Sequence, residues 1–169
     1  FNDISVPPTL ITFAVTTEKT ENIISSEFKK EGSYVYLIKH TPKENYVPNY
    51  EQLKHNFDAV RKHILNKDIL AASTVKFGGI AEALCKMSFG NKIGVSVETK
   101  EPVFDLSIGS ILVESAVEIK EDNFILLGKT TSDGMIAINK ETVSMEEAIS
   151  TWCERYNKIY PMTTDEDGK

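Results

Sequence analysis

The residues best placed to do chemistry lie in one segment, residues 71–80, where an apolar run leads to Ser73, Lys76 and the pair Gly78-Gly79. The apolar run predicts a strand, and the spacing of apolar residues after the glycines predicts a helix. The first N–H groups of a helix are unpaired and lie at the positive end of its dipole, and glycine lets a phosphate approach them. We therefore predict a phosphate or nucleotide site at Ser73, Lys76, Gly78 and Gly79. The glycine pair also fits a simple tight turn, so its spacing leaves both interpretations open.

The other polar residues form no pattern typical of catalysis or of metal binding. His40, His55 and His63 lack the spacing of metal ligands, and His55 and His63 fall on a helix face expected to be solvated. No serine has a G-x-S-x-G context, and the acidic pairs at 121–122 and 146–147 are typical of turns and helix starts. We therefore expect no catalytic side chain and no metal site in this chain.

Length and charge set the class of protein. The chain has 169 residues, which predicts one domain over residues 1–162, followed by an acidic tail or linker at 163–169. Its 25 acidic and 19 basic residues give a net charge of −6, which argues against binding to nucleic acid or to anionic membranes. No apolar run is long enough for a membrane span, and the first residues do not resemble a signal peptide. The absence of an initiator Met suggests a piece of a longer polypeptide.

Two cysteines, Cys85 and Cys153, are too few for a disulfide framework and fall on the apolar faces of predicted helices. We expect both to be buried and reduced, as in a cytoplasmic protein.

Strands and helices are mixed along the chain. Alternation or short apolar runs predict strands at residues 9–16, 34–39, 69–75, 93–98, 110–117, 123–128 and 135–138. A helix is predicted from the N-cap Asn49, a second over residues 80–89, and a third from the capping box of Ser144 and Glu147. The order predicts an α+β sandwich, in which a mixed sheet is covered by helices. We expect the helix with Leu53 and the helix with Trp152 to be its main covers.

The apolar faces of the first and third helices follow from the same spacing. The first is expected to bury Leu53, Phe57, Val60 and Ile64. The third is expected to bury Met145, Ala148, Ile149, Trp152 and Tyr156.

Several segments together resemble the C-terminal domain of the aminoimidazole ribonucleotide (AIR) synthetase superfamily, and within it the phosphoribosylformylglycinamidine synthase family. The resemblance lies in the glycine turn and helix at 78–89, the entry at 6–10, the segment 24–29, the strand 34–38, the pair 94–95, the residues 128–130 and the closing helix with Trp152 and Tyr160-Pro161. These pieces occur in order over nearly the whole chain. The resemblance implies the same α+β fold.

The sequence departs from the family pattern where that pattern carries polar chemistry. The family has a His-Asp-x-Ser-Asp-Gly-Gly-Leu loop, whereas this chain has Ser73, Thr74 and Phe77 in place of the His and the two Asp residues. A carboxylate can hold Mg²⁺ beside a phosphate, and Phe and Thr cannot replace it. Residues 104–110 also depart from the Phe-Gly-Glu pattern typical of the family. These departures indicate the less catalytic, second half of an internally duplicated enzyme.

The resemblance implies a parent ligase of purine biosynthesis that uses ATP, Mg²⁺ and glutamine. In that family ATP activates the formamide oxygen of formylglycinamide ribonucleotide as an iminophosphate, and ammonia from glutamine displaces phosphate to give the amidine. The implied partners are the N-terminal domains and the glutaminase domain of the same synthase. We expect this domain alone to bind no cofactor and to be inactive.

Two alternatives stay open. One is a non-catalytic packing domain, which predicts an exposed apolar patch where partner domains dock. The other is a domain of a sister ATP-dependent family, such as selenophosphate synthetase or thiamine-monophosphate kinase.

Overall fold

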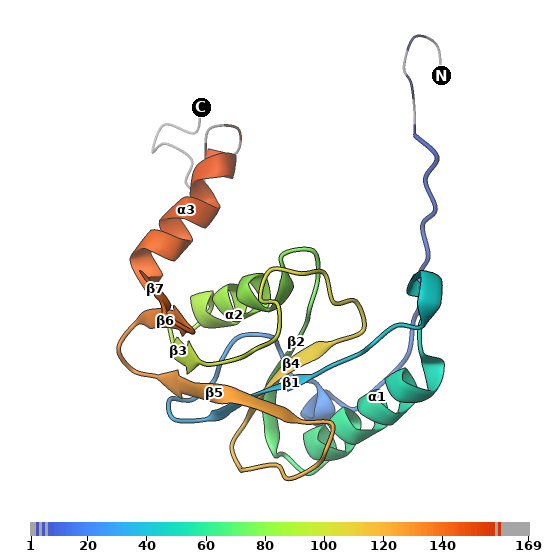
Figure 1. Ribbon diagram of the computed structural model, residues 1–169, viewed down its shortest axis with the longest axis horizontal. Coiled ribbons are helices and arrows are strands. Elements are labelled where there is room, and N and C mark those ends of the chain that lie inside the picture. The colour runs from blue at the N-terminus through green and yellow to red at the C-terminus, as the bar shows by residue number, and fades with distance from the viewer. Residues whose placement is uncertain (1–2, 4, 6, 158, 160–169) are drawn as a thin grey trace.

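The computed structural model describes residues 3, 5, 7–157 and 159 (Figure 1). Two short 3-10 helices, η1 (Thr20–Asn22) and η2 (Glu44–Tyr46), lie in connecting segments. The helices are α1 (Tyr50–Leu65), α2 (Gly79–Phe89) and α3 (Met145–Asn157). The strands are β1 (Tyr34–Ile38), β2 (Ile69–Thr74), β3 (Gly94–Val97), β4 (Ile111–Ser115), β5 (Ile125–Thr131), β6 (Met135–Ile138) and β7 (Glu141–Ser144).

The strands form one mixed sheet of seven strands, in the order β2-β4-β1-β5-β3-β6-β7. The β3–β6 pair is parallel, and the other neighbouring pairs are antiparallel. This sheet, with its three helices, confirms the predicted α+β class. The prediction missed β7, a short strand whose Glu141 and Thr142 are exposed and which lacks an apolar run.

Two helices cover the two faces of the sheet (Figure 1), because successive strand residues point to opposite faces. On one face Val35 and Leu37 of β1 pack with Leu84 and Met87 of α2. On the other face the neighbouring Tyr36 and Ile38 pack in a cluster with residues of α1. Each helix thus buries one stripe against β1 and the strands beside it.

Helix α1 begins as predicted, since the side chain of its N-cap Asn49 accepts a hydrogen bond from the Gln52 N–H at 3.3 Å. Its buried face is rotated from the prediction, because Phe57 is half-exposed whereas Asn56 is buried. The Asn56 amide donates to the Lys39 carbonyl at 3.0 Å and accepts from the Asn123 amide at 3.2 Å. These two bonds satisfy a polar group that the apolar pattern placed outside the core.

The Trp152 helix packs against the core at its start, through Met145, Ala148 and Ile149, but the prediction that it is a main cover is wrong. Helix α3 begins at the edge strand β7 and extends beyond the sheet (Figure 1). Its Met145 is buried, but Trp152 is 54% exposed and touches the domain through the Phe89 ring, 5.7 Å away between ring centres. The predicted capping bond is present, from the Glu147 N–H to Ser144 Oγ at 3.2 Å. The side chain of Tyr156 lies outside the described residues.

The predicted strand at residues 9–16 is not a strand of this domain. Residues 7–16, which we call the arm, have no regular secondary structure and project from the domain (Figure 1). The alternation that predicted the strand is real, but no edge of the sheet lies beside it, and Leu10, Phe13 and Val15 are 92%, 86% and 94% exposed.

Both cysteines are half-buried rather than fully buried, and neither forms a disulfide. Burial raises the pKa of the Cys85 thiol. The predicted tail at 163–169 lies outside the described residues, so the predicted domain boundary stays a prediction. Across the part of the chain that is described, each helix is too short or too polar to cross a bilayer.

Candidate functional site

The predicted anion site is a tight turn between β2 and α2. The chain leaves β2 through Val75, which is buried and donates its N–H to the Ser110 carbonyl at 3.0 Å. Lys76 and Phe77 are exposed, and Gly78 is the N-cap of α2. The structure therefore brings Lys76, Gly78 and Gly79 together in one turn.

Gly79 is required by the backbone and by its neighbours. Its φ is +68°, a conformation that side chains disfavour. A Cβ at this position would lie 2.4 Å from the Val103 carbonyl oxygen and 2.7 Å from the Phe104 carbonyl carbon. The absence of a side chain at Gly79 therefore lets the chain's own segment 103–104 pack closely against this backbone.

Three amides at this helix start already have internal acceptors. The Gly79 N–H donates to the Lys76 carbonyl at 3.1 Å, and the Ala81 N–H donates to the Val103 carbonyl at 2.8 Å. The Gly78 N–H donates to Oε2 of Glu82 at 2.9 Å. Three donors that an anion could use are therefore taken within the fold.

Glu82 places a negative charge of the protein itself at this helix start, and sequence reasoning missed it. Its Oε1 accepts from Lys86 Nζ at 2.5 Å, and this bond, followed by the bond from the Gly78 N–H, lowers the pKa of the carboxyl. An acid in the first turn with a Lys four residues later is a signal that the sequence offered. A bound phosphate would meet this carboxylate.

Ser73 lies within β2, whereas Gly78 and Gly79 lie beyond the end of that strand. It is half-buried in β2, opposite Leu112 of β4. Two cavities flank the segment 101–107, one of about 190 Å³ beside Lys39 and Ile80, and one of about 360 Å³ beside Cys85. The residues that line these cavities do not include Ser73, Lys76, Gly78 or Gly79. Phosphate binding at these four residues stays a prediction.

The residues at this turn do not fit a Mg²⁺ ion. Mg²⁺ is held by carboxylates and phosphates, whereas Thr74 and Phe77 offer no carboxylate and Glu82 is already bound by Lys86 and an N–H. Among the described residues, no group of three or more His, Cys, Asp or Glu side chains is arranged to hold a metal ion.

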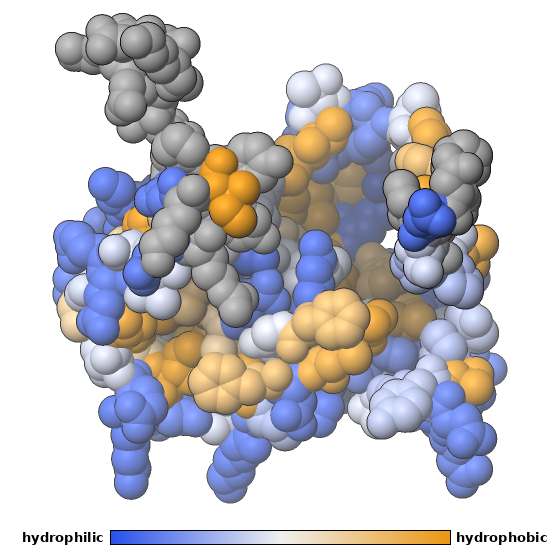
Figure 2. All heavy atoms as spheres, turned by 90° about the horizontal axis from the view of Figure 1, so that it is seen from above, coloured by the Kyte–Doolittle hydropathy of each residue, from blue (hydrophilic) through white to orange (hydrophobic). Residues whose placement is uncertain are grey.

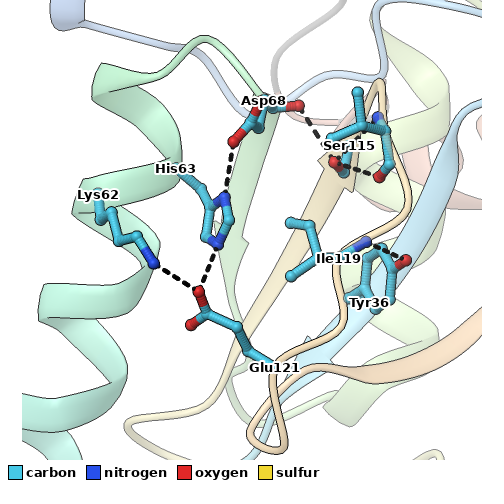
Figure 3. Close-up of polar contacts among 8 residues, drawn as sticks. Tyr36, Lys62, His63, Asp68, Ser115, Ile119 and Glu121 are labelled. Carbon is cyan, nitrogen blue, oxygen red and sulfur yellow. Dashed lines mark hydrogen bonds and ion pairs between the residues drawn. The ribbon is translucent and has the colours of Figure 1, made fainter.

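A second polar cluster joins α1 to the segment before β2 and to the segment after β4 (Figure 3). The prediction that His63 lies at the surface is wrong, because its ring is buried between two carboxylates. Its Nδ1 lies 2.8 Å from Asp68 Oδ2, and its Nε2 lies 3.0 Å from Glu121 Oε1. Lys62 Nζ also bonds Glu121 at 2.7 Å and is the larger cause of the lowered pKa of that carboxyl. The cluster holds the β4–β5 connection against α1.

His40 is also buried. Its Nε2 accepts from the Asn49 N–H at 3.1 Å, so the Nδ1, 2.8 Å from the Ile108 carbonyl, carries the proton and donates. This tautomer fastens the segment before β4 to the start of α1. Both ring nitrogens are used inside the fold, which leaves His40 no role as a catalytic base.

Glu114 is a buried carboxylate that sequence reasoning missed. It lies in the interior strand β4, is fully buried, and accepts hydrogen bonds from the N–H groups of Lys29 and Lys30 at 2.7 and 2.9 Å. An acid within the apolar run Ile111–Ser115 was the available signal. Its bonds hold the chain before β1 onto the sheet, which is a structural role.

The sheet order, its two covering helices and the glycine turn define an α+β domain of the AIR synthase-like fold. No family model matches the sequence. Solved structures with this fold include phosphoribosylformylglycinamidine synthase II from Thermotoga maritima, with a TM-score of 0.63 at 12% identity over 76% of this chain. PurL of the same organism complexed with AMPPCP aligns with a TM-score of 0.62 at 11% identity over 76% of this chain. The hydrogenase maturation protein HypE aligns with a TM-score of 0.54 at 11% identity, over 72% of this chain and 55% of its own.

The matched region is a small part of the PurL proteins. This chain covers 28% of the synthase II chain and 27% of the chain complexed with AMPPCP. The likeness is therefore to one part of a larger protein, and at these identities it shows the fold.

Proposed function

We propose that this chain is a domain of an ATP- and glutamine-dependent phosphoribosylformylglycinamidine synthase, and that it contributes structure rather than reacting groups. The observation that carries the proposal is the likeness to PurL, which extends over 76% to 78% of this chain in the PurL structures above and in that of PurLQS. PurL has also been solved with ATP, with ADP and with FGAR. A domain of such an enzyme acts within a larger ATP-using assembly.

The chemistry of the glycine turn supports a structural contribution. Phe77 is 82% exposed at the position where the family motif has an Asp. The nearby N–H groups of Gly78, Gly79 and Ala81 donate to Glu82 and to the Lys76 and Val103 carbonyls. A turn in which three N–H groups have internal acceptors, and which has Phe77 in place of a carboxylate, is suited to packing rather than to turnover. This supports the assignment to the second, less catalytic half of a duplicated synthase.

Exposed apolar side chains favour the packing alternative for the domain itself. Phe77, Phe104 and Leu106 are all exposed near the start of α2. Apolar side chains gather among polar ones on the face shown in Figure 2. Such a patch marks a surface that another folded unit covers. Within the proposed synthase the domain would pack through this surface, so the two candidates differ in parentage rather than in local chemistry.

Immunodepletion tests the parentage. An antibody raised against the folded chain is used to deplete an extract of the source cells, and ATP- and glutamine-dependent conversion of formylglycinamide ribonucleotide to the amidine is then measured. The control is the same antibody blocked beforehand with the purified chain. We expect depletion to remove most of the activity and the blocked antibody to remove none.

Two results would overturn the proposal. One is full activity in an extract from which the antigen has been removed completely. The other is amidine formation by the purified 169-residue chain alone, since that would require reacting groups that the described residues do not provide.

A further inference from the structure

The arm has the composition of a β-strand, but it pairs with no sheet in this domain. Ile11, Phe13 and Val15 alternate with smaller or polar residues, and no residue between Pro7 and Thr17 is charged. The backbone N–H and carbonyl groups of residues 10–16 have no hydrogen-bond partner among the described residues. An uncharged, apolar, β-prone segment of this kind is an aggregation hazard unless another strand covers it. The arm therefore needs a partner that hydrogen-bonds its backbone and covers its apolar side chains.

The partner that fits is a β-sheet edge rather than a groove. Period-two alternation presents Ile11, Phe13 and Val15 to one side and leaves Thr12 and Ala14 on the other. A strand with one large apolar side adds to a sheet edge, where its backbone pairs and its apolar side joins the hydrophobic layer. Pro7 and Pro8 keep the approach extended, since proline has a fixed φ.

Neither edge of the sheet described here is open along six residues, in this copy or in a second one. At the β2 edge, the Ala72 N–H already donates to the Ser25 carbonyl at 3.3 Å. The β7 edge is four residues long and starts with the exposed Glu141, too short for an apolar stretch of six residues. Exchange of arms between two copies would therefore leave much of the arm unpaired.

We propose that residues 10–15 form a strand of a second folded unit, whose sheet has an open edge and an apolar face, within the polypeptide that contains this domain. This rests on the proposed function, because the matched PurL chains are more than three times longer than the region that this chain covers. The base of the arm is fixed to this domain, since Glu18 bonds Arg61 of α1 at 2.6 Å. The arm thus joins two sheets rather than acting as a linker.

Hydrogen exchange measured by mass spectrometry tests this on the peptide covering residues 9–17. The peptide is compared in the purified chain and in the natural polypeptide captured by the antibody, whether or not that polypeptide is active. We expect rapid exchange in the purified chain and exchange slower by at least about 100-fold in the natural polypeptide, as for hydrogen-bonded strands. Loss of enzymatic activity in the captured polypeptide would then count against the proposed function but leave the arm result standing.

Matched variants separate the two sides of the arm. Phe13→Asp and Thr12→Asp introduce the same charge on neighbouring residues that face opposite ways. We expect neither to change the unfolding midpoint of the purified chain, where the arm is exposed, and Phe13→Asp to lower that of the natural polypeptide more than Thr12→Asp.

Two outcomes would overturn the inference. One is equally rapid exchange of the arm in both samples. The other is concentration-dependent dimerisation of the purified chain with protection of the arm, which would make a second copy the partner.

Discussion

Replacing Gly79 by alanine tests whether the glycine turn exists for internal packing. Gly134 provides a matched control, because both glycines have a φ of +68° but a Cβ at Gly134 would meet nothing within 4 Å. The left-handed conformation costs an alanine about 1–2 kcal/mol at either site. At Gly79 the added methyl also meets the backbone at Val103 and Phe104, and forcing an extra carbon into a packed region costs about 1–3 kcal/mol more.

The free energy of unfolding is measured by urea denaturation, followed by circular dichroism, for the wild type and both variants. We expect Gly134→Ala to lose about 1–2 kcal/mol and Gly79→Ala to lose about 2–5 kcal/mol. In thermal unfolding each kcal/mol corresponds to a midpoint change of about 2–4 °C for a protein of this size. Equal losses in the two variants would refute the argument, because they would mean that the segment 103–104 moves aside without cost.

A second measurement separates packing from the predicted anion site. Inorganic phosphate is titrated into the wild type while the amide resonances of Phe77 to Ile80 are followed by NMR. Shifts that saturate would show binding at the turn in spite of the internal bonds. Unchanged shifts at millimolar phosphate would leave packing against Val103 as the reason for the glycines.

Two further predictions concern carboxylates. In urea denaturation, Glu114→Ala should lower the free energy of unfolding by about 3 kcal/mol or more and Glu114→Gln by about 2 kcal/mol, because each hydrogen bond to a charged group contributes about 1.5–3 kcal/mol. Glu118→Ala, at an exposed position, is the control. An equally small loss in all three variants would refute the structural role of Glu114. Bonds from Asn22 and the Lys19 N–H, followed by one from Arg61, lower the pKa of Glu18 to about 2 from its ordinary 4.5. A lowered folded-state pKa stabilises the protein above pH 4.5, and this contribution is lost as the pH falls toward 2. Glu18→Gln should therefore flatten the acid limb of a stability–pH curve, and an unchanged limb would contradict this.

The sequence was sufficient for the elements whose signals are local. Strand β6, the N-cap Asn49 and the helix after the glycines follow from alternation, capping and apolar spacing, and all three are present. The mixed sheet with helices followed from their order. These features depend on residues that are neighbours along the chain.

The errors arose where contacts with residues outside the helix decide whether a side chain is buried. Asn56 and His63 are buried because Lys39, Asn123, Asp68 and Glu121 satisfy them, and helical spacing contains no information on such partners. Trp152 is apolar at the expected spacing, but its helix extends past the sheet that it was expected to cover.

The strand, the turn and the helix around the candidate site were predicted, but the hydrogen bonds of the turn were not. The turn and the helix after it lie where the pattern placed them, yet their N–H groups donate to Lys76, to Glu82 and, for Ala81, to the Val103 carbonyl. Spacing within residues 71–80 cannot show that a loop some 25 residues later fills the space expected for a ligand.

The stretch that follows the arm has a mechanical consequence. Glu18 bonds Arg61 of α1, Lys67 bonds the Glu21 carbonyl, Ser25 bonds β2, and the Phe28 N–H bonds the Met87 carbonyl of α2 at 2.8 Å. These contacts follow one another along the chain, so a pull on the N-terminal end reaches the Glu18–Arg61 bond first and the Phe28–Met87 bond last.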